Sequence, residues 1–285
     1  MSKTFTVACV QITSGPEIMP NVEAASRLVR EARKAGAEFI VTPENITCID
    51  PIRERALSKA QGEATHPAIP AFQALAAETG AWLLIGSLTI KLDATTCANR
   101  SFLFSPKGKI AARYDKIHMF DVDLVNKESY RESATFRPGR QAVTADLPWG
   151  RLGLTVCYDM RFAYLYRALA QAGSSFITVP SAFTRPTGQA HWHVLLRARA
   201  IETGCFVFAA AQTGEHAEGR KTWGHSLIVS PWGEIVAEAG EEPAILTARI
   251  DPSAVAAARR MIPALTHDRP LPVPAAPETL RRAGE

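Results

Sequence analysis

The sequence predicts an α/β fold with an internal duplication, and three patterns indicate it. Amphipathic helical segments end in a glycine that directly precedes an apolar, strand-like run. Segment 34–44 resembles 171–181, and segment 76–86 resembles 200–210. Pro-x-Gly turns between β-rich runs indicate hairpins, which would make the sheets mixed. The glycines that end the helical segments are Gly36, Gly80, Gly173 and Gly204.

The predicted elements follow one another without a linker or a low-complexity insert. Residues 4–12 form a first strand, and Asn21 is the expected N-cap of a helix that ends at Gly36 before strand 38–44. The last helix covers residues 252–262. We therefore expect one domain over residues 1–270 and a tail over 271–285, within a Pro-rich end that begins at residue 263. The other helix and strand pairs are 70–80 with 81–90, 163–173 with 174–183 and 193–204 with 205–212, and the hairpins are 101–115, 142–156 and 225–239.

The composition excludes several classes of protein. With 47% hydrophobic residues, the 285-residue chain can bury a large core. The net charge of +4 is mild and the basic residues are scattered, so we expect no nucleic-acid partner. No apolar run reaches the length of a membrane span, and the five cysteines are widely spaced without a CxxC pair. We expect a cytoplasmic protein with reduced thiols, no membrane partner and no zinc site.

Cys157 stands out because it lies where a strand-like run gives way to a helical one. Leu152, Leu154 and Val156 alternate as one face of a strand would, and residues 162–169 take up helical spacing. Helical N–H groups at such a junction would favour a thiolate and could hold an oxyanion. The alternative is that Cys157 only packs in the core, which is the more common role of a lone cysteine at a strand end.

Three more polar side chains follow predicted strands or loops. Glu44 ends strand 38–44, Lys116 follows the hairpin 101–115, and Glu132 lies in a loop closed by Pro138 and Gly139. Singly, each is readily explained as a solvated surface charge. Considered together, the Cys157 thiol, these two carboxylates and this ammonium form a set that acyl-transfer chemistry could use.

The motifs that carry these residues resemble the nitrilase superfamily, also called the carbon-nitrogen hydrolases. The similar segments are VTPEN, ARYDKIHMFDVD, YRESATFRPG, GLTVCYDMRF, PSAF, AHWHVLLRARAIET and WGHSLIVSPWGE. They occur in family order over most of residues 4–270, and KIHMFDVD, CYDMRF and AHWHVLLRARAIET are similar to the omega-amidase and deaminated-glutathione amidase branch. The resemblance implies a four-layer α-β-β-α sandwich of two mixed sheets with an internal pseudo-twofold repeat.

The resemblance also implies a catalytic set of Glu44, Lys116 and Cys157 with Glu132 in support. Glu44 would be the general base, and Lys116 with the backbone N–H of Tyr158 would stabilise the oxyanion. Cys157 would attack an amide carbon, expel ammonia and leave a thioester for water to cleave. Two carboxylates around one ammonium could raise the pKa of one of them. No cofactor or metal is required, and we interpret His118, His191, His193 and His225 as structural or supporting residues.

Arginines near the expected pocket suggest an amide that bears a carboxylate. Arg161 and Arg185 are the candidate carboxylate ligands, although Arg161 could equally brace Asp159 or a neighbouring helix. Phe183 and Thr184 are expected to line the pocket. The chain reads RFAY where the family often has RFPE, so the usual partner of Arg161 is missing.

The expected partners are a small-molecule amide and further copies of the chain, in a homodimer or a higher homo-oligomer. Family members commonly dimerise through helices next to the nucleophile, and segments 162–170 and 193–202 could provide such a surface. Alternatives within the superfamily are a nitrilase, an N-carbamoyl amino acid amidohydrolase and an acyltransferase that uses the same thioester. A non-catalytic binding protein on this scaffold is the alternative from another class.

Overall fold

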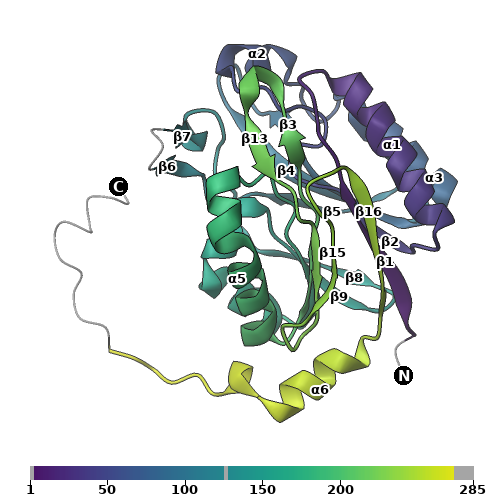
Figure 1. Cartoon of the computed structure of the whole chain (residues 1–285), viewed down its shortest axis with the longest axis vertical. Helices are drawn as coiled ribbons and strands as arrows, with labels where there is room; N and C mark the ends of the chain where they lie inside the picture. The colour runs from purple at the N-terminus through teal and green to yellow at the C-terminus, as the bar shows by residue number, and fades with distance from the viewer. Residues whose placement is uncertain (1–2, 125–127, 273–285) are drawn as a thin grey trace.

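The computed structural model describes residues 3–124 and 128–272, so most of the tail predicted at 271–285 lies outside the described residues. Two six-stranded mixed sheets form the centre of the molecule (Figure 1). The first has the order β16 (Ala244–Ile250), β1 (Phe5–Gln11), β2 (Phe39–Val41), β3 (Trp82–Lys91), β4 (Cys97–Phe104) and β5 (Ile110–Asp115). The second has the order β15 (Ile235–Glu238), β14 (Leu227–Val229), β11 (Phe206–Ala209), β10 (Ser174–Thr178), β9 (Gly150–Leu154) and β8 (Val143–Leu147).

The two sheets repeat one pairing pattern, which confirms the predicted duplication. In the first sheet β1, β2 and β3 are parallel, with antiparallel β16 on one side and the antiparallel β4 and β5 on the other. In the second sheet β9, β10 and β11 are parallel, with antiparallel β8 on one side and β14 and β15 on the other. Each strand therefore has a counterpart at the same place in the other sheet.

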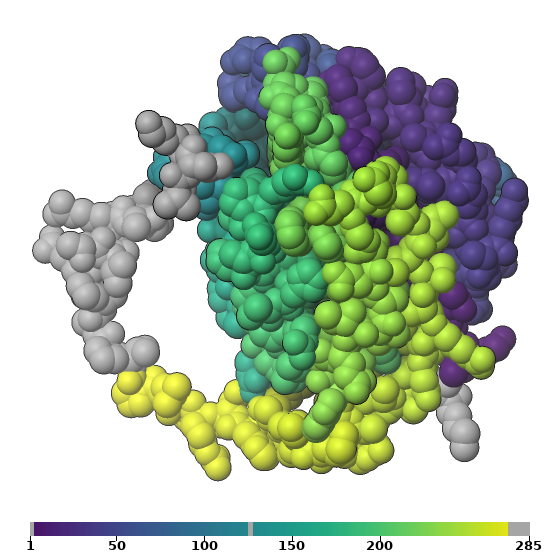
Figure 2. All heavy atoms as spheres, in the orientation of Figure 1, coloured from purple at the N-terminus to yellow at the C-terminus, as the bar shows by residue number. Residues whose placement is uncertain are grey.

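Helices cover the outer faces of both sheets and complete the four-layer α-β-β-α sandwich. Helices α1 (Ile18–Lys34) and α3 (Ala68–Thr79) pack on the first sheet, and α4 (Ala163–Gln171) and α5 (Arg185–Thr203) pack on the second (Figure 1). Helix α6 (Ser253–Met261) lies at one end of the molecule, where Figure 2 shows it in yellow. Among the described residues, no helix combines the length and the apolar character that a bilayer span needs.

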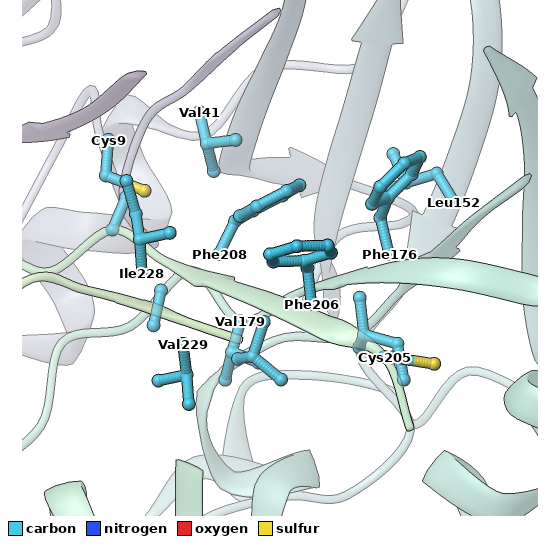
Figure 3. Close-up of a cluster of buried hydrophobic side chains, with 14 of the residues drawn as sticks. Cys9, Val41, Leu152, Phe176, Val179, Cys205, Phe206, Phe208, Ile228 and Val229 are labelled. Carbon is cyan, nitrogen blue, oxygen red and sulfur yellow. The ribbon is translucent and has the colours of Figure 1, made fainter. Parts of the chain in front are cut away.

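The alternation of side chains along the strands explains why both faces of the first sheet are buried. Val7 and Cys9 of β1 point toward the second sheet, whereas Ala8 and Val10 pack under the helices. Figure 3 shows side chains of the inter-sheet core, including Cys9 and Val41 from the first sheet and Phe208 and Ile228 from the second. The Phe39 and Phe208 rings meet edge to face across this interface, 6.0 Å apart.

Two of the four predicted helix ends are confirmed, at Gly80 and Gly204, whereas α1 and α4 have the C-caps Ala35 and Ala172, one residue before the predicted glycines. The N-cap predicted for the first helix is wrong. Gly80 and Gly204 adopt left-handed backbone conformations directly after α3 and α5. Asn21 was the expected N-cap of the first helix, yet α1 begins at Ile18 and its N-cap is Glu17. The Asn21 side chain instead bonds both backbone groups of Gly15 and the carbonyl of Thr47, because nearby loop groups compete for its amide.

Several short elements at one end of the sandwich were not predicted. They are the helix α2 (Arg53–Lys59) and the hairpins of β6 (Asp121–Asp123) with β7 (Ser129–Arg131) and of β12 (Thr213–Glu215) with β13 (Lys221–Trp223). Figure 1 shows α2 and β13 together at the top of the molecule, and Figure 2 shows the same neighbours as spheres. An ion pair between Arg55 and Glu218 joins α2 to the loop before β13. These elements form the rim of the site described next.

Candidate active site

Cys157 begins a tight turn at the C-terminal end of β9. It adopts a left-handed backbone conformation with φ of 50°, which is uncommon for a residue with a side chain. Two hydrogen bonds hold this geometry: its N–H donates to the carbonyl of Pro180 at 2.8 Å, and the N–H of Val156 donates to the Asp159 carboxylate at 2.9 Å. The residue is 8% exposed and lines a cavity. Residues held in such sparsely populated backbone conformations cluster at active sites.

Glu44 follows β2 and is almost fully buried, at 3% exposure. Its carboxylate accepts hydrogen bonds from Lys116 Nζ at 3.0 Å, Asn99 Nδ2 at 2.9 Å and the Ala182 N–H at 2.9 Å. The chain reaches this position by passing over Gly86, where a Cβ atom would lie 2.2 Å from the carbonyl oxygen of Thr42. Only glycine permits so close an approach.

Lys116 brings the two carboxylates together. Its ammonium, at 2% exposure, lies 3.0 Å from Glu44 Oε1 and 2.8 Å from Glu132 Oε2. Glu132 is held in turn by the N–H of Phe120 at 2.6 Å and by Asn99 Nδ2 at 3.2 Å. A buried charge this close to two opposite charges is stabilised in its charged form.

The surroundings set the protonation of the site. Burial raises the pKa of the Cys157 thiol and the Glu44 charge raises it further, although Lys116 opposes both. For Glu44, burial alone would raise the pKa, but the Lys116 charge and the hydrogen bonds from Cys157, Lys116 and Asn99 lower it overall. For Lys116, burial opposes the charge, but Glu132 and Glu44 raise its pKa well above the usual value. The resting site is therefore a neutral thiol, a carboxylate and an ammonium.

These protonation states correct the expected thiolate at Cys157 and bear on the raised pKa expected for one carboxylate. The sequence suggested that helical N–H groups would favour a thiolate at Cys157, but burial and the neighbouring Glu44 keep the sulfur protonated. A raised pKa was also expected for one of the two carboxylates. For Glu44 the direction is the opposite, because Lys116 and its hydrogen bonds favour the charged form.

The thiol, Glu44, Lys116 and Glu132 all line one cavity of about 690 Å³. Its wall also includes Tyr130 and Phe136, residues 182–187 at the start of α5, and residues 218–221. The volume is that of a small-molecule site. Many side chains of this wall are charged, and the burial of Glu44, Lys116 and Cys157 strengthens the electrostatic interactions among these three.

Four of the five predicted substrate contacts line this cavity, and the fifth does not. Tyr158, Phe183, Thr184 and Arg185 are in the wall, whereas Arg161 is absent from it. The Arg161 guanidinium lies over the rings of Tyr158 and Phe183, at 5.7 and 5.6 Å, and bonds His191 Nδ1 at 3.2 Å. Arg185 is exposed and forms an ion pair with Glu241.

Sequence reasoning missed Asn99, Asp159 and Arg220. Asn99 lies near the start of β4 and donates to both Glu44 and Glu132. Asp159 accepts hydrogen bonds from Tyr114 and His118, on the segment that carries Lys116. Arg220 lines the cavity from the loop before β13. Asp159 stands two residues after Cys157 within the quoted motif, so its proximity was available as a signal.

The histidines take supporting positions. His118 bonds Asp159, in agreement with a supporting role. His193 and His225 both bond Glu238 Oε1 at 2.9 Å and form with it a compact group that could hold a metal ion. None of these three residues lines the cavity of Cys157, so the group lies apart from the thiol.

The four-layer fold and the buried cluster of thiol, carboxylate and ammonium define a cysteine hydrolase with a Glu-Lys-Cys triad. A family model described as carbon-nitrogen hydrolase matches residues 6–260, so the chain belongs to that family, and it is an amidase. The resemblance to the nitrilase superfamily is thereby confirmed.

Individual relatives agree with this assignment. The deaminated glutathione amidase of Yersinia enterocolitica is 38% identical over 273 residues, which cover 94% of this chain and 94% of the relative. The omega-amidase NIT2 of Homo sapiens is 36% identical over 268 residues, 93% of this chain and 95% of the relative. The NitFhit protein of C. elegans superposes with a TM-score of 0.87 and 35% identity, over 94% of this chain and 66% of that protein.

Proposed function

We propose that this enzyme hydrolyses the amide C–N bond of a small, carboxylate-bearing amide of the deaminated-glutathione or omega-amide type. The observation that carries the proposal is the Lys116 ammonium, buried between Glu44 and Glu132 in the cavity wall that also presents the Cys157 thiol. The similarity to amidases with those two names supports the substrate class.

The mechanism follows from the resting protonation. Glu44 accepts the thiol proton as the Cys157 sulfur attacks the amide carbon. The negative oxygen that forms is stabilised by Lys116 and by the backbone N–H of Tyr158. Glu44 then returns the proton to the leaving nitrogen, which departs as ammonia or as the amine of a substituted amide, and a thioester remains. Water, deprotonated by Glu44, cleaves the thioester and releases the acid and the thiol.

Glu132 serves this chemistry through Lys116. Both of its carboxylate oxygens accept hydrogen bonds from the ammonium, at 2.9 and 2.8 Å, and the Phe120 N–H fixes the carboxylate from behind. This arrangement orients Lys116 toward the reacting carbonyl oxygen. No cofactor or metal takes part in the scheme.

A substrate screen with the wild type and Cys157→Ala tests the proposal. We expect the wild type to release ammonia or amine from deaminated glutathione or 2-oxoglutaramate faster than from glutamine, a carbamoyl amino acid or a simple nitrile. Cys157→Ala should be inactive with an unchanged circular dichroism spectrum, and a mass increase on the wild type during turnover should report the thioester. Turnover of nitriles alone would overturn the proposal, and so would amidase activity in Cys157→Ala.

We also propose that the protein is cytoplasmic and forms a homodimer or a higher homo-oligomer. The free cysteines of the chain fit a reducing compartment. Neighbouring helices α4 and α5 expose apolar side chains, with Tyr164 at 65%, Val194 at 67% and Ile201 at 54% exposure, and a second copy would cover them. Light scattering tests this: a mass of two or more chains, each of 30.9 kDa, supports the oligomer, and the mass of one chain contradicts it.

A further inference from the structure

Most cationic side chains in the cavity wall already pair with acids. Two arginines, Arg53 and Arg220, have no ion pair with any acidic group in the described part of the chain, yet both line the cavity. A cation in a substrate cavity without a protein partner is available to a substrate anion. The paired cations of the same wall are Lys116 with Glu44 and Glu132, Arg131 with Asp123, Arg185 with Glu241, and Lys221 with Glu215.

The Arg220 guanidinium is held in place but left incompletely bonded. Arg220 follows the helical turn Ala217–Gly219, and its guanidinium carbon lies 5.9 Å from the centre of the Tyr130 ring. Its Nη2 reaches the carbonyl of Ala182 at 3.5 Å, the outer limit of a hydrogen bond. Its Nε is buried and has no hydrogen-bond partner among the described residues. A buried donor of this kind is costly to leave unsatisfied, so it favours an acceptor from the ligand.

Arg53 lacks this character. Its Nε donates to Thr135 Oγ1 and its Nη2 donates to the carbonyl of Ala134, both at 3.0 Å, and its side chain is exposed. Its donors are therefore partly satisfied by protein and partly by water. Of the two arginines without a paired acid, Arg220 is the one whose buried donor has no protein partner.

Arg220 is also close to the reacting groups. Ala182, whose carbonyl it contacts, donates its N–H to Glu44 Oε2 at 2.9 Å. The same backbone segment interacts with the Cys157 thiol and lowers its pKa, against the larger effect of burial. A short acyl chain bound at the sulfur could therefore place a distal carboxylate against Arg220.

We propose that Arg220 binds the carboxylate on the acyl half of the substrate and thereby selects short amides that end in an acid. This inference rests on the proposed amidase function and names the residue that gives it specificity, in place of the sequence candidates Arg161 and Arg185. The guanidinium Nε and a terminal nitrogen would donate to the two carboxylate oxygens in the parallel geometry that arginine favours.

Paired substrates test the proposal. The monoamide of glutaric acid and pentanamide share a five-carbon chain but differ in the terminal carboxylate. For Arg220→Gln we expect KM for the acidic amide to rise on the order of 100-fold, as for loss of one partner of a buried charge pair. The kcat/KM for pentanamide should change by less than about threefold, since a neutral chain makes no ion pair. Arg220→Lys should recover little of the wild-type KM for the acidic amide, because an ammonium cannot reproduce the bidentate geometry.

Lys221→Gln is the matched control, since Lys221 neighbours Arg220 and already pairs with Glu215 at 3.3 Å. It should leave the ratio of kcat/KM values for the two amides unchanged. Equal losses on both amides, or none, in folded Arg220→Gln protein would overturn the proposal. The proposal would also be overturned if Arg161→Gln or Arg185→Gln lost the preference for the acidic amide while Arg220→Gln kept that preference.

Binding of glutarate separates this inference from the proposed function. We expect calorimetry to detect glutarate binding to Cys157→Ala. Binding should be lost in the double variant that also carries Arg220→Gln. If the wild type hydrolyses neither amide while glutarate binding still depends on Arg220, the amidase proposal fails and the carboxylate site stands. Glutarate binding that is absent, or unaltered by Arg220→Gln, refutes the carboxylate site. Circular dichroism confirms that each variant is folded.

Discussion

Asp159 Oδ1 accepts hydrogen bonds from both the backbone N–H and the Nδ1 of His118, at 3.0 and 2.7 Å. The other oxygen accepts the Tyr114 hydroxyl at 2.6 Å and the N–H of Val156 at 2.9 Å. Tyr114 and His118 flank Lys116 by two residues on each side, and Val156 precedes Cys157. One fully buried carboxylate thus fixes the distance between the segment that carries the ammonium and the turn that carries the nucleophile.

Replacing Asp159 by Asn should therefore uncouple the two segments. The neutral amide cannot accept all four hydrogen bonds, since one of its two heavy atoms is a donor. We expect kcat to fall by about 10- to 100-fold, because small displacements of catalytic groups are costly, and alkylation of Cys157 by iodoacetamide to change in rate. Asp146→Asn, which removes only an exposed pair with Arg151, is the control. A wild-type kcat in Asp159→Asn would contradict this role.

Glu44→Gln should remove the general base while preserving the shape of the site. We expect kcat to fall by about 10²- to 10⁴-fold, the usual contribution of general acid-base catalysis. The melting temperature should also fall, since Lys116 would keep only Glu132 as a counter-charge. Steady-state kinetics and thermal unfolding measure both effects. Glu78→Gln, at an exposed pair with Arg30, should alter neither, and a Glu44→Gln enzyme with near-normal kcat would exclude Glu44 as the base.

Gly86→Ala should disturb catalysis through packing alone. The added Cβ would lie 2.2 Å from the Thr42 oxygen, 2.4 Å from the Pro43 oxygen and 2.5 Å from Pro180 Cβ. These neighbours carry Glu44 and accept the Cys157 N–H, so both reacting groups would move. We expect a loss of about 1–3 kcal/mol in the free energy of unfolding, typical of overpacking, together with a lower kcat. At Gly240 a Cβ meets nothing within 4 Å, so Gly240→Ala should match the wild type in urea unfolding and kinetics.

His216 should make the protein less stable in mild acid. Burial lowers its pKa from 6.5 to about 4, and the neutral ring bonds the Ser14 carbonyl and the Thr222 hydroxyl. Because the folded pKa lies below the unfolded one, the unfolded chain binds the proton first as pH falls. Stability is complete above about pH 6.5 and declines toward pH 4, by on the order of 1–2 kcal/mol at pH 5.

Comparing the wild type with His216→Asn isolates this contribution. The variant should lose less stability than the wild type between pH 7 and pH 5, measured by urea unfolding at each pH. Some acid sensitivity should remain, because burial also lowers the pKa of His66 to about 4. His267→Asn, at an exposed position, should follow the wild type. Identical pH dependence in wild type and His216→Asn would show that His216 does not contribute.

The sequence by itself determined the fold class, the duplication and the position of the nucleophile. Helical periodicity, terminal glycines such as Gly80 and Pro-x-Gly turns are local features, and local backbone preferences act on neighbouring residues only. Cys157 was found for the same reason, since a strand that gives way to a helical run is visible within a dozen residues. The family motifs then supplied Glu44, Lys116 and Glu132 as its partners.

Only the tertiary structure decided how those partners are held and which of the other polar residues join them. Asn99 bonds Glu44 across 55 positions of sequence, and Arg220 meets Ala182 across 38. The protonation of Cys157 likewise depends on burial and on a distant carboxylate, which reversed the local expectation of a thiolate. Such contacts depend on how strands and loops pack in space, and no periodicity in the chain encodes them.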